Sequence, residues 1–95
     1  MTPYTDIEVT PTFKVREFSA DVEVQELYWH RDDEDRTVEV LEVGNNWHFQ
    51  RDNHLPEPLV QGTKIFIQRH DWHRVIKGSG HLLIKIFKHG KEKAN

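Results

Sequence analysis

The 95-residue sequence contains no cysteine, which excludes disulfide bonds and thiolate metal sites. A metal ion would therefore need histidine, aspartate or glutamate as its ligands. The sequence also lacks a run of about 18 apolar residues, the length that a membrane-spanning helix requires. Residues 1–6 lack the basic and apolar regions of a signal peptide. We therefore expect a protein that stays in the cytoplasm and does not enter a membrane.

Positive charge is scarce in the first two thirds of the chain. Residues 1–63 carry 5 Lys and Arg against 14 Asp and Glu, whereas residues 64–95 carry 8 against 2. A basic C-terminal segment is one sign of nucleic-acid binding. We favour pairing between strands of the two halves, which makes opposite charges cross-strand neighbours and leaves residues 91–95 as a frayed tail. Nucleic acid is therefore not the partner that we expect.

Apolar residues alternate with other residues in short runs, and no run keeps helical spacing over three turns. Turn-forming residues separate these runs at 19–21, 44–46, 52–56 and 77–80. Short strands at this spacing predict an all-β protein made of antiparallel sheets, with one domain over residues 1–95. The alternating residues are Ile7 and Val9; Phe13 and Val15; Val22 and Val24; Val38 and Val40; Trp47 and Phe49; Ile65 and Ile67; and Leu82, Ile84 and Ile86.

Three side chains are candidate metal ligands. In an extended segment His30 and Asp32 project to the same face, because successive side chains alternate. His73, on a later neighbouring strand, would complete the set. Two histidines and one carboxylate with open positions are the ligands of non-haem Fe(II) oxygenases, and similar donors suit Mn, Ni or Zn.

The spacing of these residues resembles the two motifs of the cupin superfamily. The first motif reads Gly, five residues, His-x-His, three or four residues, Glu, six residues, Gly. His30 and Asp32 stand at its two histidines, Arg36 stands at its glutamate, and Gly44 comes one residue late. The second motif reads Gly, five residues, Pro-x-Gly, two residues, His, three residues, Asn. Gly62 and His73 match its glycine and histidine, whereas Gln68, His70 and Lys77 replace the proline, the glycine and the asparagine.

The resemblance implies a small antiparallel jelly-roll β-barrel with a divalent metal on its inner wall. Short uncharacterised cupin-like proteins encoded by phages also resemble three segments of this sequence, at 29–36, 55–56 and 73–78. Only His30 and His73 transfer directly as ligands, with Asp32 as a conservative replacement. Arg36 cannot be a ligand, because its guanidinium stays protonated and repels a dication.

Three roles for Arg36 stay open at this point. Asp32 lies between Arg36 and the metal; or Arg36 is a catalytic residue that clamps the carboxylate of an anionic small molecule; or the metal is lost and Asp32 and Arg36 form a structural ion pair. The first two roles describe a metal-dependent enzyme or binding protein with Fe, Mn, Ni or Zn. The third describes a metal-free binding or regulatory module, so the sequence does not decide whether the protein is an enzyme.

Several further side chains have two interpretations. Trp47 and Phe49 fill the core and leave His48 exposed, or His48 and Gln50 turn inward toward the site. Trp29 and Trp72 pack between the sheets, or they form a binding or dimer surface. The segment around Ile7 and Val9 is the candidate edge strand for a homodimer. We expect His54 and His70 to be solvated surface histidines, whereas His81 and His89 have no partner at a suitable spacing.

Overall fold

The computed structural model describes residues 3–89, so the predicted frayed tail at 91–95 lies outside the described residues. Nearly all regular structure is β-strand, as the sequence predicts, with a single short 3-10 helix, η1. No described helix is long and apolar enough to cross a membrane. The elements are β1 Thr5–Val9, β2 Phe13–Phe18, η1 Val24–Glu26, β3 Arg36–Asn45, β4 His48–Arg51, β5 Glu57–Pro58, β6 Lys64–Ile67, β7 His73–Ile76 and β8 Ser79–Lys88.

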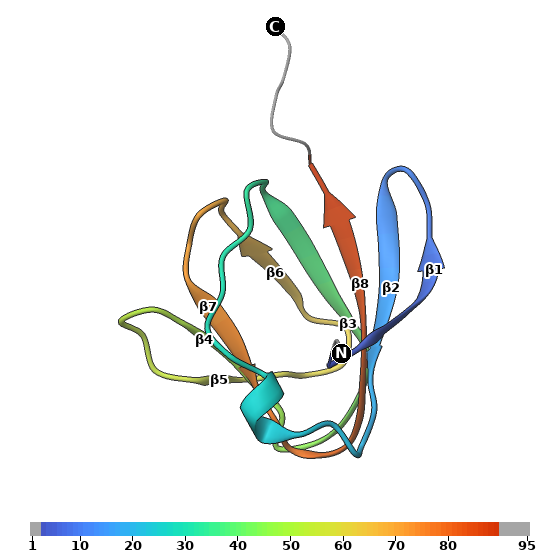
Figure 1. Cartoon of the computed structure of the whole chain (residues 1–95), viewed down its shortest axis with the longest axis vertical. Helices are drawn as coiled ribbons and strands as arrows, with labels where there is room; N and C mark the ends of the chain where they lie inside the picture. Colours follow the sequence, from blue (N-terminus) through green and yellow to red (C-terminus); the bar gives the residue numbers. More distant parts are fainter. Residues whose placement is uncertain (1–2, 90–95) are drawn as a thin grey trace, which may run out of the picture.

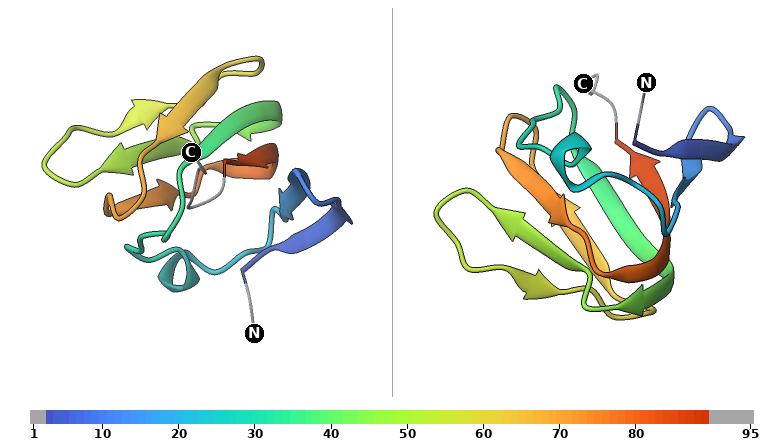
Figure 2. Two further views of the ribbon diagram at one scale, coloured as in Figure 1. Left: turned by 90° about the horizontal axis from the view of Figure 1, so that it is seen from above. Right: turned by 60° about the horizontal axis from the view of Figure 1, so that its bottom comes forward.

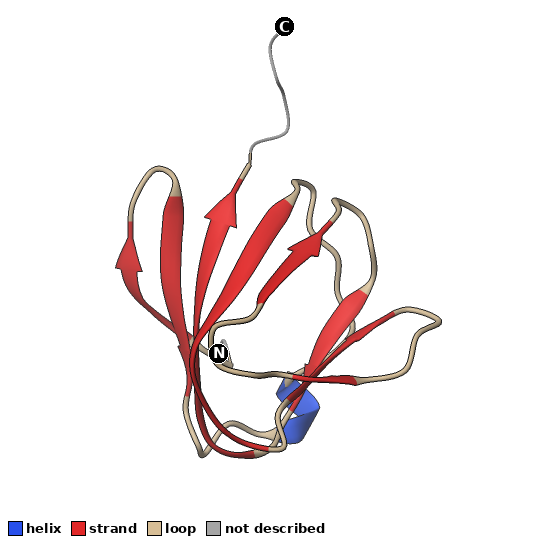
Figure 3. Ribbon diagram, turned by 180° about the vertical axis from the view of Figure 1, so that it is seen from behind, coloured by secondary structure: helices blue, strands red, loops and turns tan. Residues whose placement is uncertain are grey.

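The strands form two antiparallel sheets that face each other (Figure 1). One sheet has five strands in the order β1-β2-β8-β3-β6, and the other has three in the order β5-β4-β7. From β3 onward the chain passes from one sheet to the other after β3, β5, β6 and β7, so sequence neighbours face each other across the core (Figure 3). This arrangement confirms the predicted antiparallel jelly roll.

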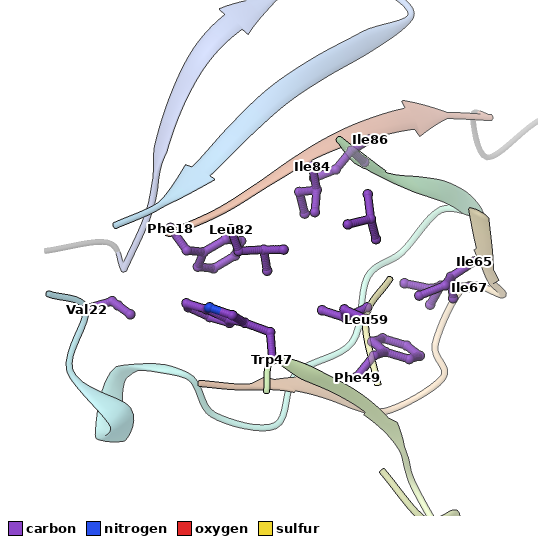
Figure 4. Close-up of a cluster of buried hydrophobic side chains, with 11 residues drawn as sticks. Phe18, Val22, Trp47, Phe49, Leu59, Ile65, Ile67, Leu82, Ile84 and Ile86 are labelled. Carbon is purple, nitrogen blue, oxygen red and sulfur yellow. The ribbon is translucent and has the colours of Figure 1, made fainter. Parts of the chain in front are cut away.

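The core lies between the sheets, where side chains from both inner faces meet (Figure 4). The indole of Trp47 is almost completely buried and lies below Phe18 and Leu82, and its Nε1 donates a hydrogen bond to the Ser79 carbonyl at 3.2 Å. Trp47 and Phe49 therefore fill the core, as the first interpretation of β4 predicts. The buried core residues are Phe18, Val22, Val40, Trp47, Phe49, Leu59, Ile65, Ile67, Leu82, Ile84 and Ile86.

Cross-strand register fixes which side chains of the five-stranded sheet face the interior. Lys14 pairs with Ile86 and Arg16 with Ile84, and directly paired residues share one face of a sheet. Two cationic side chains of β2 therefore lie on the same inner face as the core isoleucines. Val15 pairs with Lys85 on the outer face. Lys14 and Arg16 of β2 thus point toward the interior, whereas the apolar Val15 between them points outward.

Two predicted strands are wrong. Val24 begins η1 instead of extending a strand from Val22, although Val22 itself is buried in the core. His30 and Asp32 lie in the loop between β2 and β3, where only His30 forms an isolated bridge, with His73.

The predicted cross-strand pairing of charges is present on β3, where Glu39 lies opposite both Lys64 and Lys85.

Candidate metal centre

The loop before β3 runs beside β7 (Figure 2). The three candidate ligands lie on these two segments. The His30 amide donates a hydrogen bond to the His73 carbonyl at 3.0 Å, and the His73 amide donates back to the His30 carbonyl at 2.9 Å. Two residues along, the His70 amide donates to the Asp32 carbonyl at 2.7 Å. The loop is therefore held like a short strand, and its period of two points His30 and Asp32 to one side.

His30, Asp32 and His73 each offer a ligand atom, and these atoms lie within 4.8 Å of one another. Neighbouring ligands of one ion lie about 3.0–3.4 Å apart when each bond is about 2.1 Å long. Binding of one ion by all three atoms would therefore require the widest of these separations to close by more than about 1 Å. The two imidazoles are in edge contact, with ring centroids 4.3 Å apart.

Backbone carbonyls fix the tautomer of both imidazoles. Tyr28 O lies 3.2 Å from His30 Nδ1, and Asp71 O lies 2.7 Å from His73 Nδ1. A carbonyl oxygen only accepts hydrogen bonds, so each Nδ1 carries the proton and each neutral ring keeps its lone pair on Nε2. Metal-bound histidines usually donate from their other ring nitrogen to a carbonyl or carboxylate in the same way. His48 and His54 make the same local bond, so the distinguishing feature of His30 and His73 is their convergence.

Nε2 of buried His73 lies 3.4 Å from Asp32 Oδ2. With the proton on Nδ1, this contact places two hydrogen-bond acceptors face to face, which is unfavourable unless positive charge joins them. That charge is either a cation bound by both atoms or a second proton on His73. The donor set and its tautomers therefore fit a divalent metal ion.

Arg36, at the start of β3, lies on the other side of Asp32. Its Nη1 is 3.3 Å from Asp32 Oδ1, while Oδ2 faces His73. Burial raises the pKa of Asp32, but His73 and the charge of Arg36 outweigh this effect and hold the pKa below 3.8. The Nε of Arg36 lies 3.5 Å from Glu34 Oε2, a contact that fails hydrogen-bond geometry, so this buried nitrogen lacks a hydrogen-bond partner among the described residues.

His30 is partly open to solvent, yet its ring lies against His73. Partial burial lowers the pKa of His30 below 6.5, and the nearby charges of His73 and Arg36 act in the same direction. The hydrogen bond to the Tyr28 carbonyl and the charge of Asp32 oppose the shift. His30 is therefore neutral at pH 7, which is the form that binds a metal.

The three candidate ligands line a cavity of about 420 Å³ between the sheets. Its walls also include Arg36 and, from β2, Lys14 and Arg16. Neither Lys14 nor Arg16 is a candidate on sequence grounds. Both lie on the same face of β2 as buried Phe18, and that this face is the inner one depends on the register with β8, which the sequence does not reveal.

The remaining candidates lie outside the site. His48 and Gln50 are half-buried on the face opposite Trp47 and Phe49, and Gln50 accepts a hydrogen bond from Arg74 at 2.9 Å. The interpretation that Trp29 and Trp72 pack between the sheets is wrong, because their side chains are 36% and 44% exposed. Arginines cover them instead: Arg74 lies 4.8 Å from the Trp29 ring and Arg31 5.2 Å from the Trp72 ring. His54 and His70 are exposed, as predicted, and His81 and His89 are exposed as well.

No protein-family model matches this sequence, and no curated protein matches it. Solved structures do match. DMSP lyase DddQ from Ruegeria pomeroyi DSS-3 superposes with a TM-score of 0.68 at 12% identity, over 90% of this chain and 42% of DddQ. HppE, solved with Co(II) and Tris buffer, has a TM-score of 0.67 at 18% identity, over 93% of this chain and 54% of HppE.

A cupin domain from Bordetella pertussis Tohama I superposes with a TM-score of 0.60 at 19% identity, over 95% of this chain and 98% of that domain. This chain therefore spans about half the length of DddQ and of HppE, and nearly the full length of the cupin domain. Identities this low show the fold and leave the chemistry to the site's own residues. The chain has the small antiparallel jelly-roll fold of the cupin superfamily.

Proposed function

We propose that His30, Asp32 and His73 bind one divalent metal ion, and that Arg36 orients the carboxylate of a small anionic molecule beside it. The observation that carries the proposal is the contact between His73 Nε2 and Asp32 Oδ2, two acceptors 3.4 Å apart. A cation bound to both atoms turns this repulsion into coordination. The Co(II) in HppE gives independent support, because that protein has the same fold.

The donor set suits Fe(II), Mn(II), Ni(II) or Zn(II). Such an ion, when bound with open positions, supplies Lewis-acid polarisation of a carbonyl or a binding place for oxygen and substrate. Asp32 separates the guanidinium of Arg36 from the imidazoles, so Arg36 need not repel the ion directly. The buried Nε of Arg36 lies 3.5 Å from Glu34 Oε2 but makes no hydrogen bond among the described residues, so it can donate one to a carboxylate.

Metal stoichiometry tests the proposal directly. Metal-free protein titrated separately with Fe(II), Mn(II), Ni(II) and Zn(II) is expected to bind one ion per chain in calorimetry and in elemental analysis after desalting. His73→Ala is expected to weaken binding by more than the roughly 10–100-fold that loss of an outer-shell partner costs. The matched control is His54→Ala, because His54 makes the same bond from Nδ1 to a carbonyl but is exposed.

Equal metal affinity in the two variants would contradict the proposal, as would wild-type protein that binds none of the four ions. The melting temperature of each variant is measured alongside, so that loss of metal binding is not confused with unfolding.

The metal-free module is the second candidate, and the ion pair between Arg36 and Asp32 favours it. In that case a second proton on His73, rather than a cation, joins Nε2 to Asp32. Nitrogen NMR of the chelator-treated protein at neutral pH distinguishes the two. The module requires both nitrogens of His73 to stay protonated when metal is added, whereas a metal site requires the Nε2 signal to change.

A further inference from the structure

A second charged group lies on the inner face of the sheet, away from the candidate ligands. Arg16 donates from Nε to Asp6 Oδ1 at 2.7 Å and from Nη2 to Asp6 Oδ2 at 3.3 Å. Lys14, two residues earlier, contributes only a long contact to the same carboxylate, with Nζ 3.9 Å from Oδ2. Asp6 therefore satisfies Arg16 in a two-bond pair and leaves Lys14 weakly compensated.

These cations are largely withdrawn from water. The side chains of Lys14 and Arg16 are 18% and 12% exposed, and both line the same cavity as the candidate metal ligands. The guanidinium of Arg16 also lies over the Tyr4 ring, 3.5 Å from its centroid, which fixes its plane. Two cations share one carboxylate, so this group carries one unbalanced positive charge. Glu26 also lines the cavity, but no hydrogen bond or ion pair joins it to Lys14 or Arg16 within the described residues.

The electrostatics agree with this geometry. Burial, with repulsion from Arg16, lowers the pKa of Lys14, and the attraction of Asp6 does not compensate. Arg36 contributes to the same lowering, so its charge reaches the pair across β8. A charged lysine in this position costs stability, and an anion that entered the cavity would remove the cost.

We propose that Lys14 and Arg16 form a carboxylate-binding subsite, and that the small molecule bound in the cavity is a dicarboxylate. The inference rests on the proposed function for its first carboxylate, which Arg36 orients beside the metal ligands. The second carboxylate binds at Lys14 and Arg16. A single unbalanced positive charge matches one carboxylate, whereas Asp6 repels the additional charge of a phosphate group.

Calorimetric titration tests the subsite, with unbranched dicarboxylates of three to six carbons, acetate and inorganic phosphate as probes. At least one dicarboxylate is expected to bind the metal-loaded protein about tenfold or more tightly than acetate, the gain from one further charge-assisted contact. Lys14→Met is expected to remove most of this gain without lowering the melting temperature. Asp6→Asn is expected to strengthen dicarboxylate binding, because it removes the competing carboxylate, even though it weakens the fold.

The matched control is Lys85→Met. Lys85 is a partly buried lysine on the outer face of the same sheet, opposite Val15, and its substitution leaves dicarboxylate affinity unchanged. Equal affinity for acetate and every dicarboxylate, equal loss in Lys14→Met and Lys85→Met, or tighter binding of phosphate would overturn the proposal. Lys14-dependent binding of a dicarboxylate to protein that takes up no metal would overturn the proposed metal site and leave the subsite standing.

Discussion

At the residue scale, Asp32 shows how an arginine can stand where the cupin motif has a glutamate. Its two oxygens face different partners, Arg36 at 3.3 Å and His73 at 3.4 Å. The carboxylate therefore screens the guanidinium from the two imidazoles. Of the three possible roles of Arg36, the ion pair with Asp32 is present in the structure. A metal ion could still bind on the far side of Asp32, beside His73.

Arg36→Met separates a ligand-orienting role from a structural one. We expect the variant to bind one metal ion with affinity equal to or above that of the wild type, because a repelling charge is removed. Binding of acetate to the metal-loaded variant is expected to fall by about tenfold, the loss for one charge-assisted hydrogen bond. Calorimetry measures both affinities. Loss of the metal itself would instead show that Arg36 is needed to hold Asp32 in place.

At the element scale, the ends of β3 and β8 approach so closely that two glycines are required. A Cβ at Gly78 would lie 1.9 Å from the Asn45 carbonyl oxygen, and a Cβ at Gly44 would lie 2.0 Å from the Ser79 carbonyl oxygen. Both obstacles are backbone atoms, so a side chain cannot be accommodated by a change of rotamer. Gly62 differs, because it has open space around it but a φ of +88°.

We therefore expect Gly78→Ala to lower the free energy of unfolding by about 3 kcal/mol, at the upper end of ordinary substitutions. Gly62→Ala, the comparison variant, should cost about 1–2 kcal/mol, the penalty for a left-handed backbone at a residue with a Cβ. Urea unfolding curves measure both. A larger loss in Gly62→Ala than in Gly78→Ala would contradict this account of the strand ends.

β1 forms one edge of the five-stranded sheet, and its Ile7 and Val9 are 56% and 65% exposed. An exposed apolar edge strand is the element by which a second copy could extend the sheet. Pairing of two chains through this segment stays a prediction, which light scattering on the purified protein measures.

Across the whole molecule, the loop before β3 is joined to β7 by two backbone hydrogen bonds between His30 and His73 and by the side-chain contact of Asp32 with His73. A metal ion that bridges His73 on β7 to His30 and Asp32 in this loop would therefore fasten the loop to the three-stranded sheet. A ligand that binds only the folded state stabilises it in proportion to the logarithm of its concentration.

Metal at 100 times its dissociation constant should stabilise the protein by about 2.7 kcal/mol, which corresponds to a rise in melting temperature of about 10 °C or more for a chain of this size. A chelator should reverse the rise, and His73→Ala should abolish it.

The metal-free protein should lose stability as pH falls below 6.5, because burial lowers the folded pKa of His30 and the unfolded chain takes up the proton first. Thermal scans across pH, with and without metal, measure both effects.

The fold class and the three candidate ligands follow from the amino-acid sequence alone. Alternation and turn residues predict most of the strands, and the period of two puts His30 and Asp32 on one side; both are local signals, because they act within a few residues. His73 lies far along the chain, and its place in the second cupin-like motif selects it as the residue that converges with them. No local signal marks η1. Val22 and Val24 alternate with polar residues as they would in a strand, yet Val24 begins this short helix.

The surroundings of the site follow only from how the chain folds. The register between β2 and β8 turns Lys14 and Arg16 inward, and a shift of one residue would have exposed them. The pairing of a loop with β7 brings His30 beside His73 and places Asp32 between His73 and Arg36. These features depend on contacts between distant parts of the chain, so local pattern could name the candidate ligands but not the charges that face them.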